Sequence, residues 1–599
     1  MCGIVGSIHT NFNLSKALSK IKHRGPDADG IFENDQIQFG HVRLSILDLS
    51  TAGNQPFVNE ATGSVLVFNG EIYNYKELKS EMESQYTFQT TSDTEVLFYG
   101  LQKFGISFVS RLQGMFAFAY YDGDHQVSYL VRDRLGIKPL YYRKVDNGYL
   151  FASEIKAIQN ENFNEQQINQ KRLADFIYHR RLDHTTETFY NGIYQLPSGT
   201  YIKFDHKELE AKQVSYYELP CMGSGKQNLE AIELKEKIYA TVQSHLQADV
   251  PVGSFLSGGV DSSIISHVMS QLVADKVSTL SGRTVYDHAE NKLIDTFLEE
   301  HPNVHSIQFQ LDGSQFFEEI FNVIHHHDEP ILDGSMFSHY MLCKKASDNG
   351  IKVVLSGSGG DEVFGGYESH SIASLTDHIR TLKFKLFFIK IRRYCSFHHQ
   401  NKARVVSKII AELLGQKVKE AFKNLRKQKS ILVLDANPDL FKSSCQTYTA
   451  NAFERSLKYQ TVPPYLHYED RNSMAFGVEI RVPFLDHQLI EYVSQIKSDD
   501  FFNGQTKSAL RKAFASEISG KIIWQAKKEG FPSPIDTALK SDTRIKEFFY
   551  KKLTSTPFLN TEECKKLANE FYENGTQLTL FWRLLSYMIW YHIQLEKNV

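Results

Sequence analysis

The stretch Ser257-Gly258-Gly259-Val260-Asp261-Ser262-Ser263 follows a short apolar run, Val250–Leu256, and precedes a predicted helix over Ser262–Leu272. Two adjacent glycines remove Cβ atoms where a phosphate would approach backbone N–H groups, and a helix start adds N–H donors and partial positive charge. The stretch lacks the Gly-Lys-Ser/Thr ending of a Walker loop. Alone, such a turn is more often a plain connection, but the order strand, loop, helix indicates an α/β unit.

A second loop of this kind supports that interpretation. Ser356–Gly360 follows the apolar run Lys352–Leu355 and leads directly into Asp361. Apolar strands that alternate with helices, such as one predicted over Leu229–Leu246, are typical of a parallel sheet. The region from about residue 230 onward is therefore predicted to be α/β, with a largely helical C-terminal part.

The first part of the chain has a different pattern. The runs Ser64–Phe68, Met115–Tyr121 and Val127–Val131 are short, apolar and bounded by turn sequences, which favours strands packed in sheets. Helical patterns there are limited to residues 74–84 and 92–104. The polar stretch between residues 200 and 230 is predicted to contain the domain boundary.

The composition excludes several protein classes. The 599 residues include 67 lysines and arginines, 70 acids and 42% hydrophobic residues. A mainly disordered chain and a general attraction to nucleic acid are both excluded. We see no secretory signal and no apolar run long enough for stable membrane insertion. Six scattered cysteines without a CxxC pair argue against a zinc cluster or disulfide framework and predict a reducing, cytoplasmic location. All of these cysteines except Cys2 are interpreted as inert thiols.

One segment departs from the balanced charge. Arg380–Lys429 contains 15 lysines and arginines against two acids, with interleaved apolar residues such as Leu386 and Phe388. We interpret residues 380–430 as a basic helical excursion with a solvated face. The alternative is a basic rim that attracts an anionic substrate or lipid headgroups.

The sixth cysteine, Cys2, has a chemical role that its position suggests. Aminopeptidases generally remove Met1 before a small residue, which would make Cys2 terminal. A terminal cysteine carries a thiol nucleophile and an α-amine whose pKa of about 7.7–8.0 suits proton transfer at neutral pH. Position alone is weak support.

Further motifs accompany Cys2 and carry a family resemblance. They are Cys2–Gly6, His23–Asp27, His41–Ser45, Asn69–Asn74, Ser92–Glu95, Gly114–Ala117 and Arg132–Tyr141. This ordered series resembles the class II glutamine amidotransferase domain over residues 1–205. The resemblance implies an α+β N-terminal-nucleophile fold, an αββα sandwich.

The resemblance also implies roles in hydrolysing the glutamine side-chain amide. Cys2 would attack the amide, and its own amine would carry the proton. Asn69 and the Gly70 N–H would stabilise the oxyanion. Arg43 would bind the glutamine α-carboxylate with its planar fork. The glutamine α-ammonium would be held by Glu71 and Asp93.

The Ser257–Ser263 loop resembles the pyrophosphate loop of ATP pyrophosphatases, which cleave ATP between the α- and β-phosphates. Mg²⁺ binds through few carboxylates together with phosphate oxygens, and the resemblance assigns it to Asp261 and Asp361. Lys507 would neutralise phosphate charge, and Lys527–Phe531 completes the C-terminal pattern. The residues implied for ATP and pyrophosphate are Leu256, Ser257, Gly258, Gly259, Asp261, Ser262, Ser281, Ser356, Gly357 and Lys507.

Together the two parts resemble glutamine-hydrolysing asparagine synthetase, with an α/β ATP-pyrophosphatase domain over residues 225–599. This resemblance implies that aspartate is activated as an acyl-AMP and amidated by ammonia that travels through an internal tunnel. Enclosure keeps the ammonia unprotonated and water away from the adenylate. The implied substrates are glutamine, ATP and aspartate, with Mg²⁺ as cofactor; a homodimer stays open.

The sequence departs from the family at Ser358, where members usually have Glu or Asp. That carboxylate is thought to be the base on incoming ammonia, and a serine hydroxyl cannot replace it at neutral pH. The stretch Ser281–Glu290 is also less typical. The alternatives are therefore amidation of another carboxylate, such as a uronic acid sugar, or a non-catalytic binding relative. Groups that could compensate are Glu362, Asp361, Asp328, Glu329 or a carboxylate of the substrate.

Overall fold

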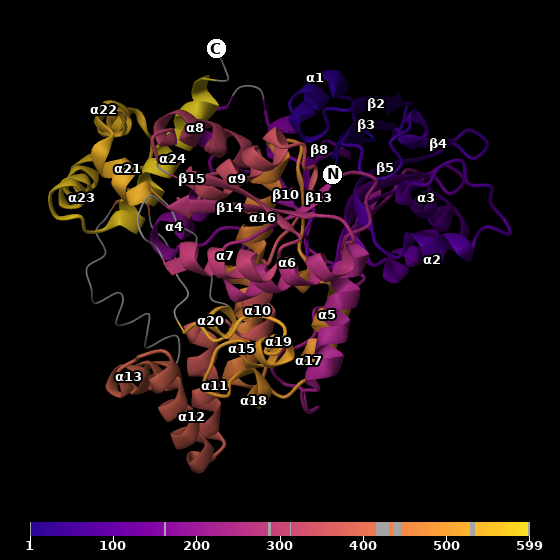
Figure 1. Cartoon of the computed structure of the whole chain (residues 1–599). Coiled ribbons are helices and arrows are strands. Elements are labelled where there is room, and N and C mark those ends of the chain that lie inside the picture. Colours follow the sequence, from indigo (N-terminus) through magenta and orange to yellow (C-terminus); the bar gives the residue numbers. More distant parts are fainter. Residues whose placement is uncertain are drawn as a thin grey trace.

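The computed structural model describes residues 2–160, 163–284, 289–311, 313–414, 431–434, 445–526 and 534–596 (Figure 1). Three predicted features lie wholly or partly outside the described residues. These are the motif Lys527–Phe531, residues 285–288 of the less typical stretch, and residues 415–430 of the basic segment.

Two antiparallel sheets form the N-terminal part. The first has the order β10 (Ile193–Gln195), β8 (Tyr141–Val145), β9 (Gly148–Ala152), β1 (Gly3–Ile8), β3 (Ile37–Arg43) and β2 (Ala28–Glu33). The second has the order β12 (Glu210–Ser215), β11 (Thr200–Asp205), β7 (Val127–Arg132), β6 (Gly114–Asp122), β5 (Ser64–Ile72) and β4 (Phe57–Asn59). The second sheet therefore continues beyond residue 205.

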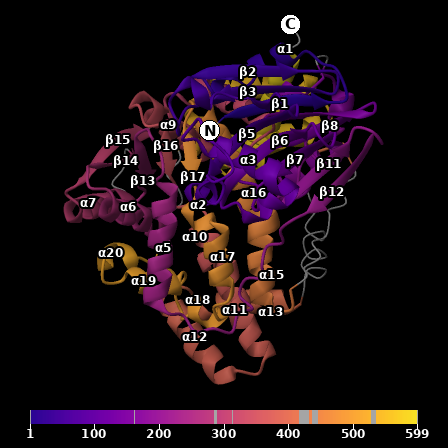
Figure 2. The ribbon, with the colours of Figure 1, turned by 90° about the vertical axis from the view of Figure 1, so that its right-hand side faces the viewer.

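The two sheets stack face to face with helices outside them (Figure 2). Side chains alternate along each strand, so β1 sends Ile4 into the core between the sheets and Val5 toward helix α1 (Leu14–Ser19). Val67 of β5 enters the same inner core, and Phe68 packs beneath the helices α2 (Tyr75–Ser80) and α3 (Asp93–Phe104). This arrangement confirms the predicted αββα sandwich.

A parallel sheet forms the centre of the C-terminal part, as predicted. Its order is β15 (Val304–Leu311), β14 (Val277–Thr284), β13 (Val252–Phe255), β16 (Val353–Leu355) and β17 (Glu479–Arg481). The chain runs outward from β13 to β14 and β15, and then returns to the other side of β13. The loops after β13 and β16 consequently diverge at a topological switch point, where α/β sheets bind ligands.

Helices cover this sheet and fill most of the C-terminal part. Those around the sheet are α5 (Ala231–His245), α6 (Val260–Leu272), α7 (Ala289–Glu300), α8 (Phe316–His327), α9 (Met336–Asp348), α10 (Gly360–Phe364) and α16 (Val462–Met474). The others are α11 (Glu368–Arg380), α12 (Phe384–Phe397), α13 (Lys402–Leu413), α15 (Tyr448–Arg455), α17 (His487–Ser494), α18 (Ser498–Phe501), α19 (Ser508–Phe514), α20 (Gly520–Ile523), α21 (Ile535–Ser541), α22 (Thr543–Lys552), α23 (Thr561–Asn574) and α24 (Leu578–Glu596). Helix α4 (Gln170–His179) comes from the N-terminal part and shares a core with α24.

The basic segment is helical where it is described, with α12 and α13 extending away from the sheets (Figure 1). Phe387 and Ile391 of α12 pack with Val405 and Ile409 of α13 in a small core of their own. Within the described residues, no helix combines the length and apolar character that a membrane span requires.

The helix predicted over roughly residues 74–84 is present as α2, which ends at Ser80 and is followed by turn-type bonds such as Met82 N–H to Lys79 O. One sequence-based expectation was wrong. The interpretation of five inert thiols fails for Cys221 and Cys445, which the structure joins in a disulfide with a Cα–Cα distance of 6.6 Å. Their sequence separation of 224 residues hid this proximity, because tertiary folding alone brings them together.

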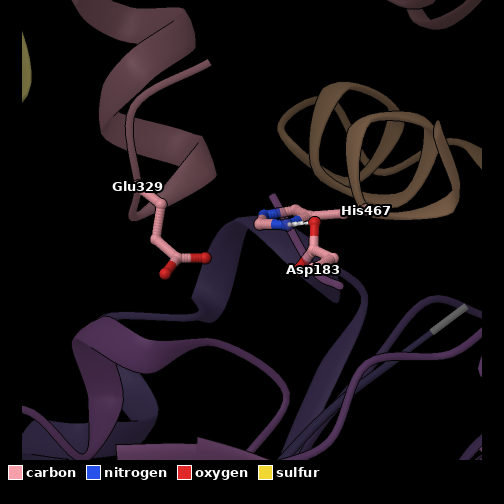
Figure 3. A group of neighbouring side chains, drawn as sticks. All are labelled: Asp183, Glu329 and His467. Carbon is pink, nitrogen blue, oxygen red and sulfur yellow. Dashed lines mark hydrogen bonds and ion pairs between the residues drawn. The ribbon is translucent and has the colours of Figure 1, made fainter. Parts of the chain in front are cut away.

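A buried charged group lies where the two parts meet. His467 of α16 pairs through Nδ1 with Asp183 Oδ2 at 3.0 Å, and Glu329 faces them (Figure 3). The other ring nitrogen, Nε2, lies 3.1 Å from the His327 carbonyl, so both nitrogens face acceptors. Burial disfavours the imidazolium, but the Asp183 carboxylate outweighs it and raises the pKa of His467. We therefore interpret the group as an ion pair of His467 and Asp183 beside the Glu329 carboxyl group, rather than as a metal site.

This group predicts a pH-dependent stability. Burial, and then the Asp183 charge, raise the pKa of Glu329 to about 7, above its unfolded value. Ionisation of Glu329 therefore destabilises the folded protein as pH rises from about 4.5 to 7. We expect Glu329→Gln to raise the melting temperature more at pH 8 than at pH 5. The amide oxygen can still accept the Phe189 N–H, now bound at 2.6 Å. An equal gain at both pH values would contradict this assignment.

Candidate active sites

The first site surrounds Cys2 at the start of β1. Cys2 is 9% exposed, and its backbone N–H donates to Asn69 Oδ1 at 3.0 Å. Burial raises the pKa of the Cys2 thiol, while the positive charge of Arg43 opposes that effect. The thiol therefore needs a nearby proton acceptor to become a nucleophile, and an adjacent α-amine would supply one.

Asn69 and Gly70 lie on β5 beside Cys2, as an oxyanion site requires. Asn69 is fully buried, and its Nδ2 has no hydrogen-bond partner among the described residues. A buried N–H₂ without a partner is costly, so a ligand oxygen is its natural acceptor. Gly70 pairs with Phe116 of β6, and a Cβ there would lie 2.2 Å from the Met115 carbonyl. Glycine is thus required by the close strand approach.

Arg43 is the last residue of β3, and its side chain contacts the loop that follows the strand. Its Nη1 donates to the Ser50 carbonyl and to Asn54 Oδ1, both at 2.7 Å, and its Nη2 contacts the Asp48 carbonyl. Gly53 stands against this guanidinium, because a Cβ there would lie 2.3 Å from Nη2. These contacts with the loop hold the guanidinium in place.

Asp93 and Glu71, the predicted ammonium ligands, are both buried on the same side of this site. Asp93 is the first residue of α3, and its Oδ2 accepts the Ile72 N–H at 2.8 Å. Burial raises the pKa of Asp93 to about 6, although that hydrogen bond opposes the shift. Burial and the neighbouring Glu479 raise the pKa of Glu71. A ligand cation would relieve this crowding of acids.

Strand β17 contributes two residues to this first site that received no role there in the sequence analysis. Arg481 lies 3.2 Å from Glu71, and its Nε donates to Glu479 Oε1 at 2.6 Å. The Glu479 and Arg481 side chains are both fully buried. The signal was present in the sequence, since Glu479-Ile480-Arg481 brings an acid and a base, two residues apart, into a short strand of the central sheet. Such buried charges are rare unless they are paired.

The second site begins with the predicted loop between β13 and α6. Gly258 has a φ of +75°, a conformation that favours glycine, and Gly259 caps α6. Ser257 and Ser262 approach each other, with their hydroxyl oxygens 3.0 Å apart. The sequence analysis missed Gln525, whose Nε2 donates to the Gly258 carbonyl at 3.1 Å. Backbone and hydroxyl donors at a helix start suit a phosphate group.

Lys507 and two aspartates converge on this loop. Lys507 precedes α19 and pairs with Asp261 of α6 and, at 2.6 Å, with Asp361 of α10. Two carboxylates beside a lysine are a suitable donor set for Mg²⁺ with phosphate oxygens. The structure therefore brings together the three residues expected to serve the metal and the phosphates.

The other residues predicted to bind the nucleotide make contacts between neighbouring segments at this edge of the sheet. The Ser281 hydroxyl of β14 donates at 2.6 Å to the carbonyl of Leu256, the residue that follows β13. Gly357 lies against the start of α6, since a Cβ there would be 2.8 Å from Ser262 N. Ser356 follows β16, and its hydroxyl donates to Glu469 at 2.8 Å. The loops after β13 and β16 thus meet at the switch point.

Arg24 connects the two sites, another contact that the sequence analysis missed. Its Nε donates to the Cys2 carbonyl at 3.1 Å, while Nη1 and Nη2 bind the Asp470 carboxylate of α16 at 2.8 and 2.9 Å. Nη1 also donates to Glu154 at 2.9 Å. Arg24 is completely buried. A bidentate pair of this kind fixes geometry as well as charge.

Comparisons with known proteins identify the family of each part of the chain. Residues 1–217 match the glutamine amidotransferase domain family, and residues 233–592 match the asparagine synthase family. Glutamine-hydrolyzing asparagine synthetase 1 of Bacillus subtilis (strain 168) is 29% identical, with 100% of this chain and 98% of the relative covered.

Two further relatives are named for different activities, one as an asparagine synthetase and one as an amidase. A putative glutamine-hydrolyzing asparagine synthetase 2 of Methanocaldococcus jannaschii is 35% identical over 64% of this chain and 78% of its own. Amidase chry2 of Gibberella zeae is 28% identical over 86% of this chain and 84% of its own. The chain belongs to the glutamine-hydrolysing asparagine synthetase family, and it is an ATP-dependent ligase that uses glutamine as its nitrogen donor.

Proposed function

We propose that this ligase makes asparagine by amidating the side-chain carboxylate of aspartate. The observation that carries the proposal is the end-to-end likeness to the Bacillus asparagine synthetase, which covers both sites. The reaction would release glutamate, AMP and pyrophosphate. It requires one site that liberates ammonia and another that activates a carboxylate.

At the first site, Cys2 attacks the glutamine amide once Met1 has been removed. The α-amine of Cys2 takes the thiol proton and returns it to the departing ammonia. Asn69 Nδ2 and the Gly70 N–H stabilise the oxyanion, and the orphaned state of Nδ2 supports this role. Arg43 binds the substrate carboxylate, and Asp93 with Glu71 binds the substrate ammonium.

At the second site, the Ser257–Ser262 loop and α6 bind the phosphates that leave as pyrophosphate. Lys507 offsets the phosphate charge. Mg²⁺, bound through Asp261 and Asp361, would supply further charge neutralisation at the phosphates. A carboxylate oxygen attacks the α-phosphorus, and AMP then provides the leaving group that a free carboxylate lacks.

We predict that glutamine affinity depends on the ionisation of Asp93. Its pKa of about 6 means that the carboxylate becomes protonated below that value and loses its attraction for the substrate ammonium. The KM for glutamine should therefore rise about tenfold per pH unit below pH 6. Steady-state glutaminase kinetics between pH 5 and 8 measure this.

Two variants give this prediction its controls. Asp93→Asn removes the charge, so the KM for glutamine should be high at every pH. The inflection near pH 6 in the pH dependence of the KM should then vanish. Glu95→Gln alters another buried carboxylate of α3, bound to Gln89 and Thr90 rather than to the site, and should keep the inflection. An inflection near pH 6 that persists in Asp93→Asn would refute the assignment.

The acceptor is tested by pyrophosphate release with candidate carboxylates. Aspartate should stimulate release and yield asparagine, whereas glucuronate and galacturonate should not. A second candidate function is the same amidation of another carboxylate, such as a uronic acid. It is favoured by Ser358 at the usual acid position and by the amidase-named relative. Release that ignores aspartate but responds to a uronic acid would select it.

A further inference from the structure

Ser358 and Ser356 share one acceptor that comes from a distant helix. The Ser358 hydroxyl donates to Glu469 Oε1 at 2.5 Å, and the Ser356 hydroxyl donates to the same oxygen at 2.8 Å. Glu469 lies on α16, 111 residues from Ser358. The loop that lacks the family's acid therefore has a carboxylate against it, supplied from elsewhere.

The second oxygen of this carboxylate is available for chemistry. Glu469 is 7% exposed, and its Oε2 has no hydrogen-bond partner among the described residues. A buried carboxylate oxygen without a donor is unfavourable unless a ligand or a proton reaches it. Burial raises the pKa of Glu469, although the two serine hydroxyls and the charge of Lys138 oppose the shift. The raised pKa makes the Glu469 carboxylate a stronger base than an exposed carboxylate.

The surroundings place Glu469 between the two sites. The next residue of α16, Asp470, binds Arg24, which holds the Cys2 carbonyl. The charge of Lys138, from the N-terminal part, acts on Glu469 as well. On the other side, Ser356 and Gly357 follow β16 at the switch point where the nucleotide loop begins. Glu469 thus lies where the contacts of the first site and those of the nucleotide loop meet.

We propose that Glu469 is the catalytic base of the amidation step, a role that rests on the proposed function of this second site. Ammonia forms a bond from its nitrogen to the acyl carbon of the adenylate. One proton passes from that nitrogen to Glu469 Oε2. The bond between the acyl carbon and the AMP oxygen breaks, and its electron pair leaves on the AMP phosphate. The Ser358 and Ser356 hydroxyls position the carboxylate through Oε1.

The other acids considered for this role face different partners. Glu362 accepts the Tyr367 hydroxyl at 2.5 Å, Asp361 pairs with Lys507 at 2.6 Å, Asp328 pairs with Lys156 at 3.1 Å, and Glu329 accepts the Phe189 N–H at 2.6 Å. None of these contacts involves Ser358. Glu469 is the acid that the structure places at the position of the missing carboxylate.

The test is Glu469→Gln, which keeps the side-chain shape and an oxygen for the serine hydroxyls but cannot take the proton. Amide formation is measured with ammonium chloride as donor, beside acceptor-dependent ATP–pyrophosphate exchange and glutamine hydrolysis. We expect the kcat of amide formation to fall at least 100-fold, while exchange and glutaminase change less than threefold. Glu454→Gln, a carboxylate on α15 that is also 7% exposed, is the matched control and should keep all three.

A rescue variant and the pH dependence of kcat distinguish a catalytic role of Glu469 from a purely structural one. In the double variant Ser358→Glu, Glu469→Gln a carboxylate returns on the loop, and we expect at least tenfold recovery of amide formation. The wild type should lose kcat at acid pH as Glu469 is protonated, and Glu469→Gln should lack that inflection.

The two proposals can fail separately. If the wild type shows no aspartate-dependent exchange but exchange with another acid, the acceptor is wrong and the base is tested with that acid. If exchange is normal and Glu469→Gln still forms amide at the wild-type rate, the inference about Glu469 is overturned. It is equally overturned if Glu362→Gln, and not Glu469→Gln, abolishes amide formation.

Discussion

Replacing Cys2 with alanine should abolish glutamine hydrolysis while amidation from free ammonia continues. The thiol is the proposed nucleophile, and Asn69 and Gly70 have no intermediate to stabilise without it. Losing a nucleophile typically lowers the rate by at least about 10³-fold. Met1 should still be removed, because alanine is also small. Glutamate release and ammonium-dependent amide formation, assayed on one preparation, measure the two effects.

A matched control distinguishes chemistry from loss of a buried thiol. Cys343 on α9 is also buried, and it lies among the residues around the parallel sheet. Cys343→Ala should keep glutaminase activity within a few-fold of the wild type. Glutamate release by Cys2→Ala at the wild-type rate would exclude Cys2 as the nucleophile, whatever its surroundings.

The second large effect concerns Lys507. Lys507→Gln should lower acceptor-dependent ATP–pyrophosphate exchange about 10³-fold, because a charge aimed at the phosphates disappears and the two aspartates lose their cation. Lys507 has a φ of +56°, so glutamine, which also carries a Cβ, keeps a comparable backbone strain. Glutamine hydrolysis should be unchanged, because Cys2 and its partners are not altered.

Lys512 provides the comparison for this variant. It lies on α19 close to Lys507 in sequence, but its side chain is exposed. Lys512→Gln removes the same charge from the helix that Lys507 precedes, and it should keep exchange within about twofold. Equal losses in the two variants would mean that net charge, rather than a lysine at the phosphates, determines the rate.

Much of the fold follows from local sequence patterns. Ser64–Phe68 predicts β5 because short apolar runs between turns form strands, and the Ser257–Ser263 loop predicts the junction of β13 with α6. Residues close in sequence, such as Asn69 and Gly70, enter the site as a unit. Their neighbours along the chain are enough to identify them, and the family resemblance then supplies the roles.

The contacts that escaped prediction join residues far apart in the chain. Arg24 and Asp470 are separated by 446 residues, and Ser358 and Glu469 by 111. No local pattern specifies such pairs, since strand order and helix packing determine which side chains meet. Serine at position 358 showed that the usual acid of the family is absent there. Only the three-dimensional structure identifies Glu469 as the acid that lies against this serine.

The adjacent pair Glu469 and Asp470 has a consequence for how this enzyme can diversify. One turn of α16 serves the ligase loop through Glu469 and the glutaminase through Asp470 and Arg24. Chimeras that exchange the N-terminal half between relatives would have to inherit a compatible turn of this helix with it. Such a turn ties the evolutionary histories of the two halves together, even though each has its own fold.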